Sequence, residues 1–267
     1  VLETIQPASV RAVCYQLFIR RVIPDMSLSS TRKVGAQLVY AREHDLIPWD
    51  WIVDETREAE RVSQWQDAAQ FADVVQRAYR RDRWQDQPRL IEVWSEKGTV
   101  RGTLAPILNR YGVTFRVMHG FGSATVVHDV AEDTSDVLAL YVGDWDPSGL
   151  YMSEADLPAR LERYGGDAEI ERIALTGADI RNLPSFPAAT KRGDPRYKWF
   201  VRYHGTQCWE LDAMNPVDLR ERVADAIFAN IDPEPWQRAE LVERAERESF
   251  IRVMGEWRRS SASDSHD

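Results

Sequence analysis

Apolar and polar positions follow one another along the chain in blocks that predict strands and helices in turn. Two nearly continuous apolar runs, 89–95 and 137–142, have the length and composition of buried strands. Between them, the spacing of apolar residues predicts a helix over 99–111, a strand over 113–118 and a helix over 123–131. Strands that alternate with helices indicate parallel pairing, so we expect an α/β fold with a mainly parallel sheet.

The flanking parts of the chain are predicted to be mostly helical. Before the first apolar run we expect helices over 7–22, with Ser9 as N-cap, and 31–44, an extended segment over 46–57 and a long helix over 64–81. After the second run we expect a helix over 150–164, strands over 168–175, 199–203 and 207–211, and helices over 217–230 and 234–257. A disordered polar tail over 258–267 completes the prediction.

These elements suggest three parts. We expect an N-terminal module over 1–87, a central domain with its C-terminal extension over 88–231, and a charged terminal helix with its tail over 232–267. The N-terminal module combines two helices, the second of them basic, with an extended segment. That combination is typical of a winged-helix DNA-binding module. A small helical subdomain with a solvated basic face fits the same pattern.

Composition and charge limit the classes of function that this protein can have. The hydrophobic fraction of 43% and the charged fraction of 29% describe a soluble protein. We expect it to be cytoplasmic, because the sequence shows neither a signal pattern nor the roughly 20 apolar residues of a membrane span. A net charge of −9 argues against nucleic-acid binding by bulk electrostatics and leaves binding through a local basic patch. Cys14 and Cys208 form no metal-binding spacing and are expected to be buried.

Three carboxylates follow the two apolar runs. Glu96 comes directly after the first run, and Asp144 and Asp146 follow the second, two positions apart and therefore on one face. Ligands of parallel sheets bind beyond the carboxyl ends of the strands, where these acids would meet. Clustered carboxylates repel one another unless a cation neutralises them, and their hard oxygens suit Mg²⁺, with Mn²⁺ as an alternative ion.

Basic residues supply candidate DNA contacts. Arg32, Lys33 and Arg42 lie on the polar face of the helix predicted over 31–44. Lys97 directly follows Glu96, where it would contact a phosphate or pair with a neighbouring acid.

A tyrosine near the N-terminus is a candidate nucleophile. Arg11 and Tyr15 are four positions apart and hence neighbours on one helix face. A phenol with a reference pKa of about 10 is a poor nucleophile at neutral pH, and a nearby guanidinium favours the phenolate. The alternative is a core tyrosine whose hydroxyl caps a nearby group.

These motifs resemble those of a known family. Glu96-Lys97 after one strand, followed by Asp144-Trp-Asp-Pro-Ser-Gly149 after another, resembles a TOPRIM domain. The form Asp-x-Asp-Pro-x-Gly is similar to that of topoisomerase VI A subunits and the meiotic double-strand-break transesterases, including phage-like and bacterial proteins of this type. Arg11-x-x-x-Tyr15 resembles the pattern that holds the family's nucleophilic tyrosine in a winged-helix domain. With looser likeness around Asp179-Ile and Glu210-Leu-Asp-Ala-Met, the resemblance runs from about residue 8 to about residue 231.

The resemblance implies Mg²⁺-dependent DNA cleavage. Tyr15, assisted by Arg11, would attack double-stranded DNA, and a homodimer would make paired breaks because the family's tyrosine works with the metal site of the other subunit. The sequence carries no glycine-rich nucleotide motif, so topoisomerase activity would need a separate ATPase subunit. The alternatives are a hydrolytic TOPRIM nuclease, related to phage or defence proteins, and a non-catalytic DNA-binding protein.

Overall fold

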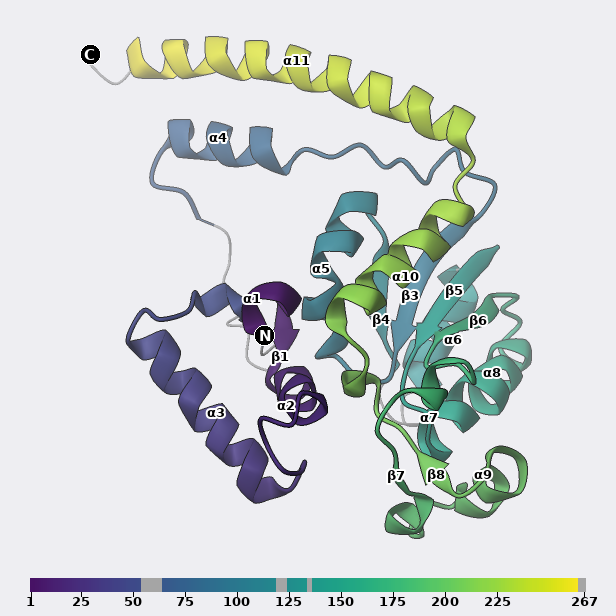
Figure 1. Ribbon diagram of the computed structural model, residues 1–267. Helices are drawn as coiled ribbons and strands as arrows, with labels where there is room; N and C mark the ends of the chain where they lie inside the picture. The colour runs from purple at the N-terminus through teal and green to yellow at the C-terminus, as the bar shows by residue number, and fades with distance from the viewer. Residues whose placement is uncertain (54–63, 119–123, 134–135, 264–267) are drawn as a thin grey trace. The chain divides into compact units, whose positions relative to one another are not determined.

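The computed structural model (Figure 1) describes residues 1–53, 64–118, 124–133 and 136–263. Contacts divide the chain into two units, of which the first comprises Val1–Arg57 and Arg89–Asn230 and the second Glu58–Pro88 and Ile231–Asp267. The helical segment that precedes the first strand of the main sheet thus groups with the C-terminal helix.

A four-stranded parallel sheet forms the centre of the first unit. Its strands are β3 (Leu90–Ser95), β4 (Thr114–Val117), β5 (Val137–Val142) and β6 (Glu169–Ala174), in the order β4-β3-β5-β6. Neighbouring strands pair in parallel throughout. The predicted α/β class and the parallel sheet are confirmed.

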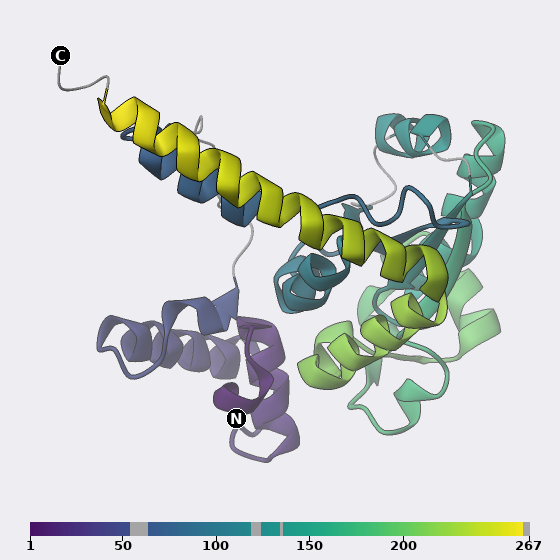
Figure 2. The same cartoon turned by 90° about the horizontal axis from the view of Figure 1, so that it is seen from above.

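Helices cover both faces of this sheet (Figures 1 and 2). On one face Trp94, Ala139 and Tyr141 form a buried cluster with residues of α6 (Ala124–Asp133) and α8 (Leu157–Arg163). The opposite face carries Val93 and Leu140, which alternate with those residues along the strands. Helices α5 (Val100–Tyr111) and α10 (Pro216–Ala229) lie on that side.

The helix expected over 150–164 contains a change of helix type. Helix α7 (Pro147–Tyr151) continues into a π-helical turn, η3 (Met152–Asp156), and then into α8. π-helical turns inside helices are frequent near functional sites.

The N-terminal part of the first unit has its own small core. It contains α1 (Leu2–Ile5), β1 (Ala8–Ser9), α2 (Val10–Ile19), α3 (Leu28–Glu43), η1 (Trp49–Trp51) and β2 (Ile52–Val53). The Ser9 side chain accepts a hydrogen bond from Ala12 N, as expected of an N-cap. Strands β1 and β2 pair in parallel. The end of the predicted extended segment, residues 54–57, lies outside the described residues.

A smaller lobe follows the main sheet. It consists of η4 (Asp179–Arg181), β7 (Phe186–Pro187), η5 (Ala188–Lys191), α9 (Tyr197–His204) and β8 (Gln207–Cys208), and η6 (Leu211–Ala213) follows it. The strand predicted over 199–203 is wrong, because these residues are helical. Phe200 is fully buried, and the half-buried Tyr197 and Val201 pack on the same cluster. These three positions have the spacing of one helix face. An apolar run as short as this one does not distinguish a helix from a strand. The strand predicted over 207–211 is reduced to Gln207–Cys208.

The second unit is built on two helices, α4 (Ala68–Ala78) and α11 (Pro233–Ser263), which lie side by side in both views (Figures 1 and 2). The Tyr79 hydroxyl donates to Glu246 at 2.6 Å, and Arg83 pairs with Glu243 at 2.8 Å. Helix α11 runs to Ser263, so the tail predicted to begin at residue 258 is wrong over 258–263. No glycine or proline stands in that stretch to end the helix. Residues 264–267 lie outside the described residues.

Within the described ranges, no helix combines the length and apolar character needed to cross a membrane.

Residues buried inside the sheet should contribute more to its stability than residues at its exposed edge. Leu140 is completely buried, whereas Leu90, on the neighbouring strand, is 41% exposed. We predict that Leu140→Ala lowers the free energy of unfolding in urea by about 2–5 kcal/mol, because it leaves a cavity. Leu90→Ala is the matched control and should cost under about 1 kcal/mol. Equal losses for the two variants would contradict this placement of the core.

Candidate functional site at the carboxyl edge of the sheet

The strand order creates a natural binding position. The chain leaves β3 toward β4 on one side and returns to β5 on the other, so the connections after β3 and β5 diverge at one edge. In doubly wound sheets, ligands bind at this switch point, beyond the carboxyl ends of the strands. Glu96 and Lys97 follow β3 there, and Asp144 and Asp146 follow β5.

Asp146 begins a helix. Its Oδ1 accepts a hydrogen bond from Gly149 N at 2.7 Å, and Pro147 occupies the first turn of α7. A Cβ on Gly149 would lie 2.5 Å from the carbonyl oxygen of Asp144, so the close approach requires glycine. Part of the Asp-x-Asp-Pro-x-Gly pattern is therefore explained by helix capping and close backbone contact. The other oxygen of Asp146 pairs with Lys191.

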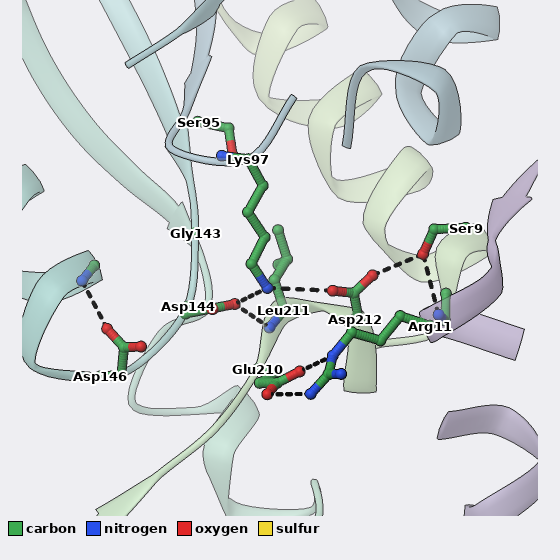
Figure 3. A network of polar contacts seen from close by, with 12 residues as sticks. Ser9, Arg11, Ser95, Lys97, Gly143, Asp144, Asp146, Glu210, Leu211 and Asp212 are labelled. Carbon is green, nitrogen blue, oxygen red and sulfur yellow. Dashed lines mark hydrogen bonds and ion pairs between the residues drawn. The ribbon is translucent and has the colours of Figure 1, made fainter. Parts of the chain in front are cut away.

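Asp144 is buried and is held by groups from two other segments (Figure 3). Its Oδ1 accepts from Lys97 Nζ at 2.8 Å and from the backbone N–H of Leu211 at 2.7 Å. Lys97 Nζ also contacts Asp212 at 3.2 Å. Burial lowers the pKa of Lys97, but the charges of Asp144 and Asp212 outweigh burial and raise it. Lys97 is thus an ammonium that joins two acids, the second of the alternatives expected for it.

The start of helix α2 contacts the same group of acids. The guanidinium of Arg11 makes two hydrogen bonds to the carboxylate of Glu210, and Ser9 Oγ donates to Asp212 at 2.8 Å (Figure 3). The residues 210–212 therefore connect α2 to Asp144. The hydrogen bonds to Glu210 raise the pKa of Arg11.

Tyr15 lies one helical turn beyond Arg11 and is 5% exposed. The Arg11 guanidinium carbon is 5.7 Å from the centre of the Tyr15 ring. Burial and the negative charge of Glu210 raise the pKa of the phenol, and the opposing effect of Arg11 is smaller. In this arrangement the phenol is neutral, and Arg11 is paired with a carboxylate.

Glu96 lies close enough to the two aspartates to be affected by their charge. Burial, followed by Asp144 and Asp146, raises the pKa of its carboxyl group to about 7. Glu96, Asp144 and Asp146 thus follow two neighbouring strands at one edge of the sheet, near enough for their charges to interact. Crowded, partly desolvated carboxylates of this kind are stabilised by a cation.

The donor chemistry of Glu96, Asp144 and Asp146 fits a hard divalent cation such as Mg²⁺. Lys97 and Lys191 supply positive charge to Asp144 and Asp146 in this arrangement. Among the described residues, no three His, Cys, Asp or Glu side chains form a group with metal-binding geometry. An ion bound here would compete with the lysine contacts.

A cavity of about 940 Å³ opens beside these groups. Its lining comes from the start of α2, the turn after β3 and the segment 210–212, and includes Ser9, Arg11, Glu96, Lys97, Arg101, Asp144, Glu210 and Asp212. It therefore carries both cations and acids, and it belongs to one unit of the chain.

The predicted DNA contacts on α3 are not among the residues that line this cavity. Arg32 and Lys33 are exposed. Arg42 is half-buried, with its guanidinium carbon 4.9 Å from the ring centre of Trp49 and its Nε donating to Leu38 O at 3.3 Å.

Several residues of the site were not predicted. Lys191 and Arg172 had no motif to identify them, whereas Glu210 and Asp212 stood in a recognised segment without an assigned role. Arg172 donates to the carbonyl oxygens of Gly143 at 3.1 Å and Gly149 at 2.7 Å. It therefore holds both ends of the loop that carries the two aspartates.

Glu92, which has no predicted role, is structural. Its carboxylate is buried and accepts two hydrogen bonds from Arg116, at 2.6 and 2.9 Å, and one from Trp94 Nε1 at 2.7 Å.

No family model, curated protein or solved structure matches this chain.

The role of Arg172 can be tested by stability. We predict that Arg172→Met lowers the free energy of unfolding by about 2 kcal/mol or more, because several loop carbonyls lose a charged donor. Arg163→Met, at an exposed position of α8, should change it by no more than about 0.5 kcal/mol. Urea titration of both variants is the measurement, and a similar effect of the two would refute this role.

Proposed function

We propose that this protein is a Mg²⁺-dependent DNA-cleaving enzyme with a TOPRIM-like site and an N-terminal winged-helix-like module. The observation that carries the proposal is the gathering of Glu96, Asp144 and Asp146 at the switch point of a parallel sheet, beside a cavity that also contains Arg11. The resemblance of the same residues to TOPRIM motifs supports it independently of the geometry.

Glu96, Asp144 and Asp146 would hold the ion. When bound, a divalent cation neutralises the phosphate and stabilises charge on the leaving oxygen. Arg11 and Arg101 also line the cavity, and guanidinium groups suit phosphate oxygens. The site therefore combines groups for a cation with groups for an anionic substrate.

Tyr15 is the proposed nucleophile. Its oxygen would form a bond to phosphorus while the bond from phosphorus to the adjoining nucleotide oxygen breaks; the phenol proton leaves, and the departing oxygen gains a proton. Support comes from the polar chain that joins its helix to the acids: Ser9 to Asp212, Asp212 to Lys97 and Lys97 to Asp144. By the resemblance, a homodimer would place each tyrosine at the partner's metal site.

Hydrolysis is the second candidate, and the surroundings of Tyr15 and Arg11 favour it. Tyr15 is buried, its pKa is raised, and Arg11 is engaged with Glu210. Attack by Tyr15 requires this arrangement to open, whereas attack by water does not. In the hydrolytic case Tyr15 is a core residue.

The acids can be tested on supercoiled plasmid with Mg²⁺ or Mn²⁺. We predict metal-dependent cutting by the native chain and at least about a 100-fold loss of rate in Asp144→Asn, because several kcal/mol of charge stabilisation disappear. Asp225→Asn, at an exposed position of α10, is the matched control and should cut normally. Failure of the native chain to cut under any metal would refute the enzyme proposal for the isolated chain and leave a DNA-binding protein.

The nucleophile can be tested by Tyr15→Phe, with Tyr40→Phe as the control at an exposed position. Transesterification predicts that Tyr15→Phe abolishes cutting and that products of the native enzyme enter a denaturing gel only after protease treatment. Cutting with free ends that survives in Tyr15→Phe would establish hydrolysis.

A further inference from the structure

Positive charge is concentrated in one stretch of an acidic chain. Residues 184–209 contain five lysines and arginines and a single acid, Asp194, although the whole chain has a net charge of −9. A protein of this charge cannot attract DNA through its overall field, so any affinity for phosphates has to be local. The helix 28–43, for comparison, contains three lysines and arginines and one acid.

This stretch forms a folded lobe, which we call the basic lobe (residues 184–209). Phe200, Ala188 and Cys208 pack with Leu150 of α7 in a fully buried cluster. Strands β7 and β8 pair with each other in antiparallel register. The backbone that carries the cations of this stretch is therefore part of a folded scaffold.

Three cations of the basic lobe face solvent. Arg192, Lys198 and Arg202 are exposed, while the apolar residues of α9 face inward. Tyr203 is 62% exposed, and the guanidinium carbon of Arg202 lies 5.3 Å from the centre of its ring. Arginine, lysine and tyrosine side chains are the usual donors to DNA phosphates.

The basic lobe is joined directly to the loop that carries the acids. Lys191 pairs with Asp146. The backbones of Trp145 and Trp209 exchange two hydrogen bonds of 2.9 Å each, and Trp145 lies between the two aspartates in the sequence. A polyanion bound to the lobe would therefore lie next to the carboxylate edge of the sheet.

We infer that the basic lobe is a docking surface for the phosphate backbone of duplex DNA, through Arg192, Lys198 and Arg202. The inference rests on the proposed function and extends it, because it assigns substrate binding to a segment outside the N-terminal module. Contacts of arginine and lysine side chains with phosphates carry no direct sequence information, so binding through these three residues is independent of sequence.

The test is DNA affinity without cleavage. Binding of a fluorescent 30-base-pair duplex is followed by anisotropy in EDTA at several salt concentrations, using the full chain. The triple variant Arg192→Gln, Lys198→Gln, Arg202→Gln should bind at least about 10-fold more weakly, and the slope of log affinity against log salt should fall by about 2 to 3. The matched control carries Arg110→Gln, Arg163→Gln and Arg238→Gln, which remove the same charge from exposed positions elsewhere.

The outcomes separate this inference from the proposed function. Weaker binding and a smaller slope in the lobe variant alone support the docking surface, even if no metal produces cutting. Equal affinity of the lobe and control variants, or absence of DNA binding by the native chain, overturns it. Circular dichroism of both variants confirms that the exposed substitutions leave the fold intact.

Discussion

The structure depends on how negative charge is compensated at the carboxyl edge of the parallel sheet. Glu96, Asp144 and Asp146 are brought together there by the ends of β3 and β5. Each compensating cation comes from a different segment: Lys97 from the turn after β3, and Lys191 from the basic lobe. Arg11 of α2 likewise neutralises Glu210 nearby. Charge compensation thus links segments that are far apart in the sequence.

This linkage gives the site two kinds of chemistry. Carboxylates that already attract lysines also suit a divalent cation, and the arginines and lysines that neutralise them suit phosphates. A metal-assisted reaction on a phosphodiester uses both. Tyr15 is buried and Arg11 is paired with Glu210, so the proposed transesterification requires this arrangement to open, whereas the alternative of hydrolysis does not.

The sequence predicted the sheet and the position of the acids well, because periodicity and strand order follow from local patterns. Ser9 as N-cap and the burial of Cys14 and Cys208 were equally local inferences. The role of Lys191 could not be predicted from the sequence, because its contact with Asp146 joins residues 45 positions apart and the lobe that carries it has no recognisable pattern. The helix at Tyr197–His204 was mistaken for a strand because its apolar run is too short for periodicity to decide. Glu210 and Asp212 were visible as a motif, but their contacts with α2 depend on tertiary structure.

Direct measurement of ion binding tests whether the three acids act together on a divalent cation. Mn²⁺ titration followed by electron paramagnetic resonance reports binding without DNA or turnover. We predict saturable binding by the native chain that weakens at least about 10-fold in Glu96→Gln and is unchanged in Asp225→Asn. Absence of saturable binding, or equal binding by Glu96→Gln and the native chain, would contradict it.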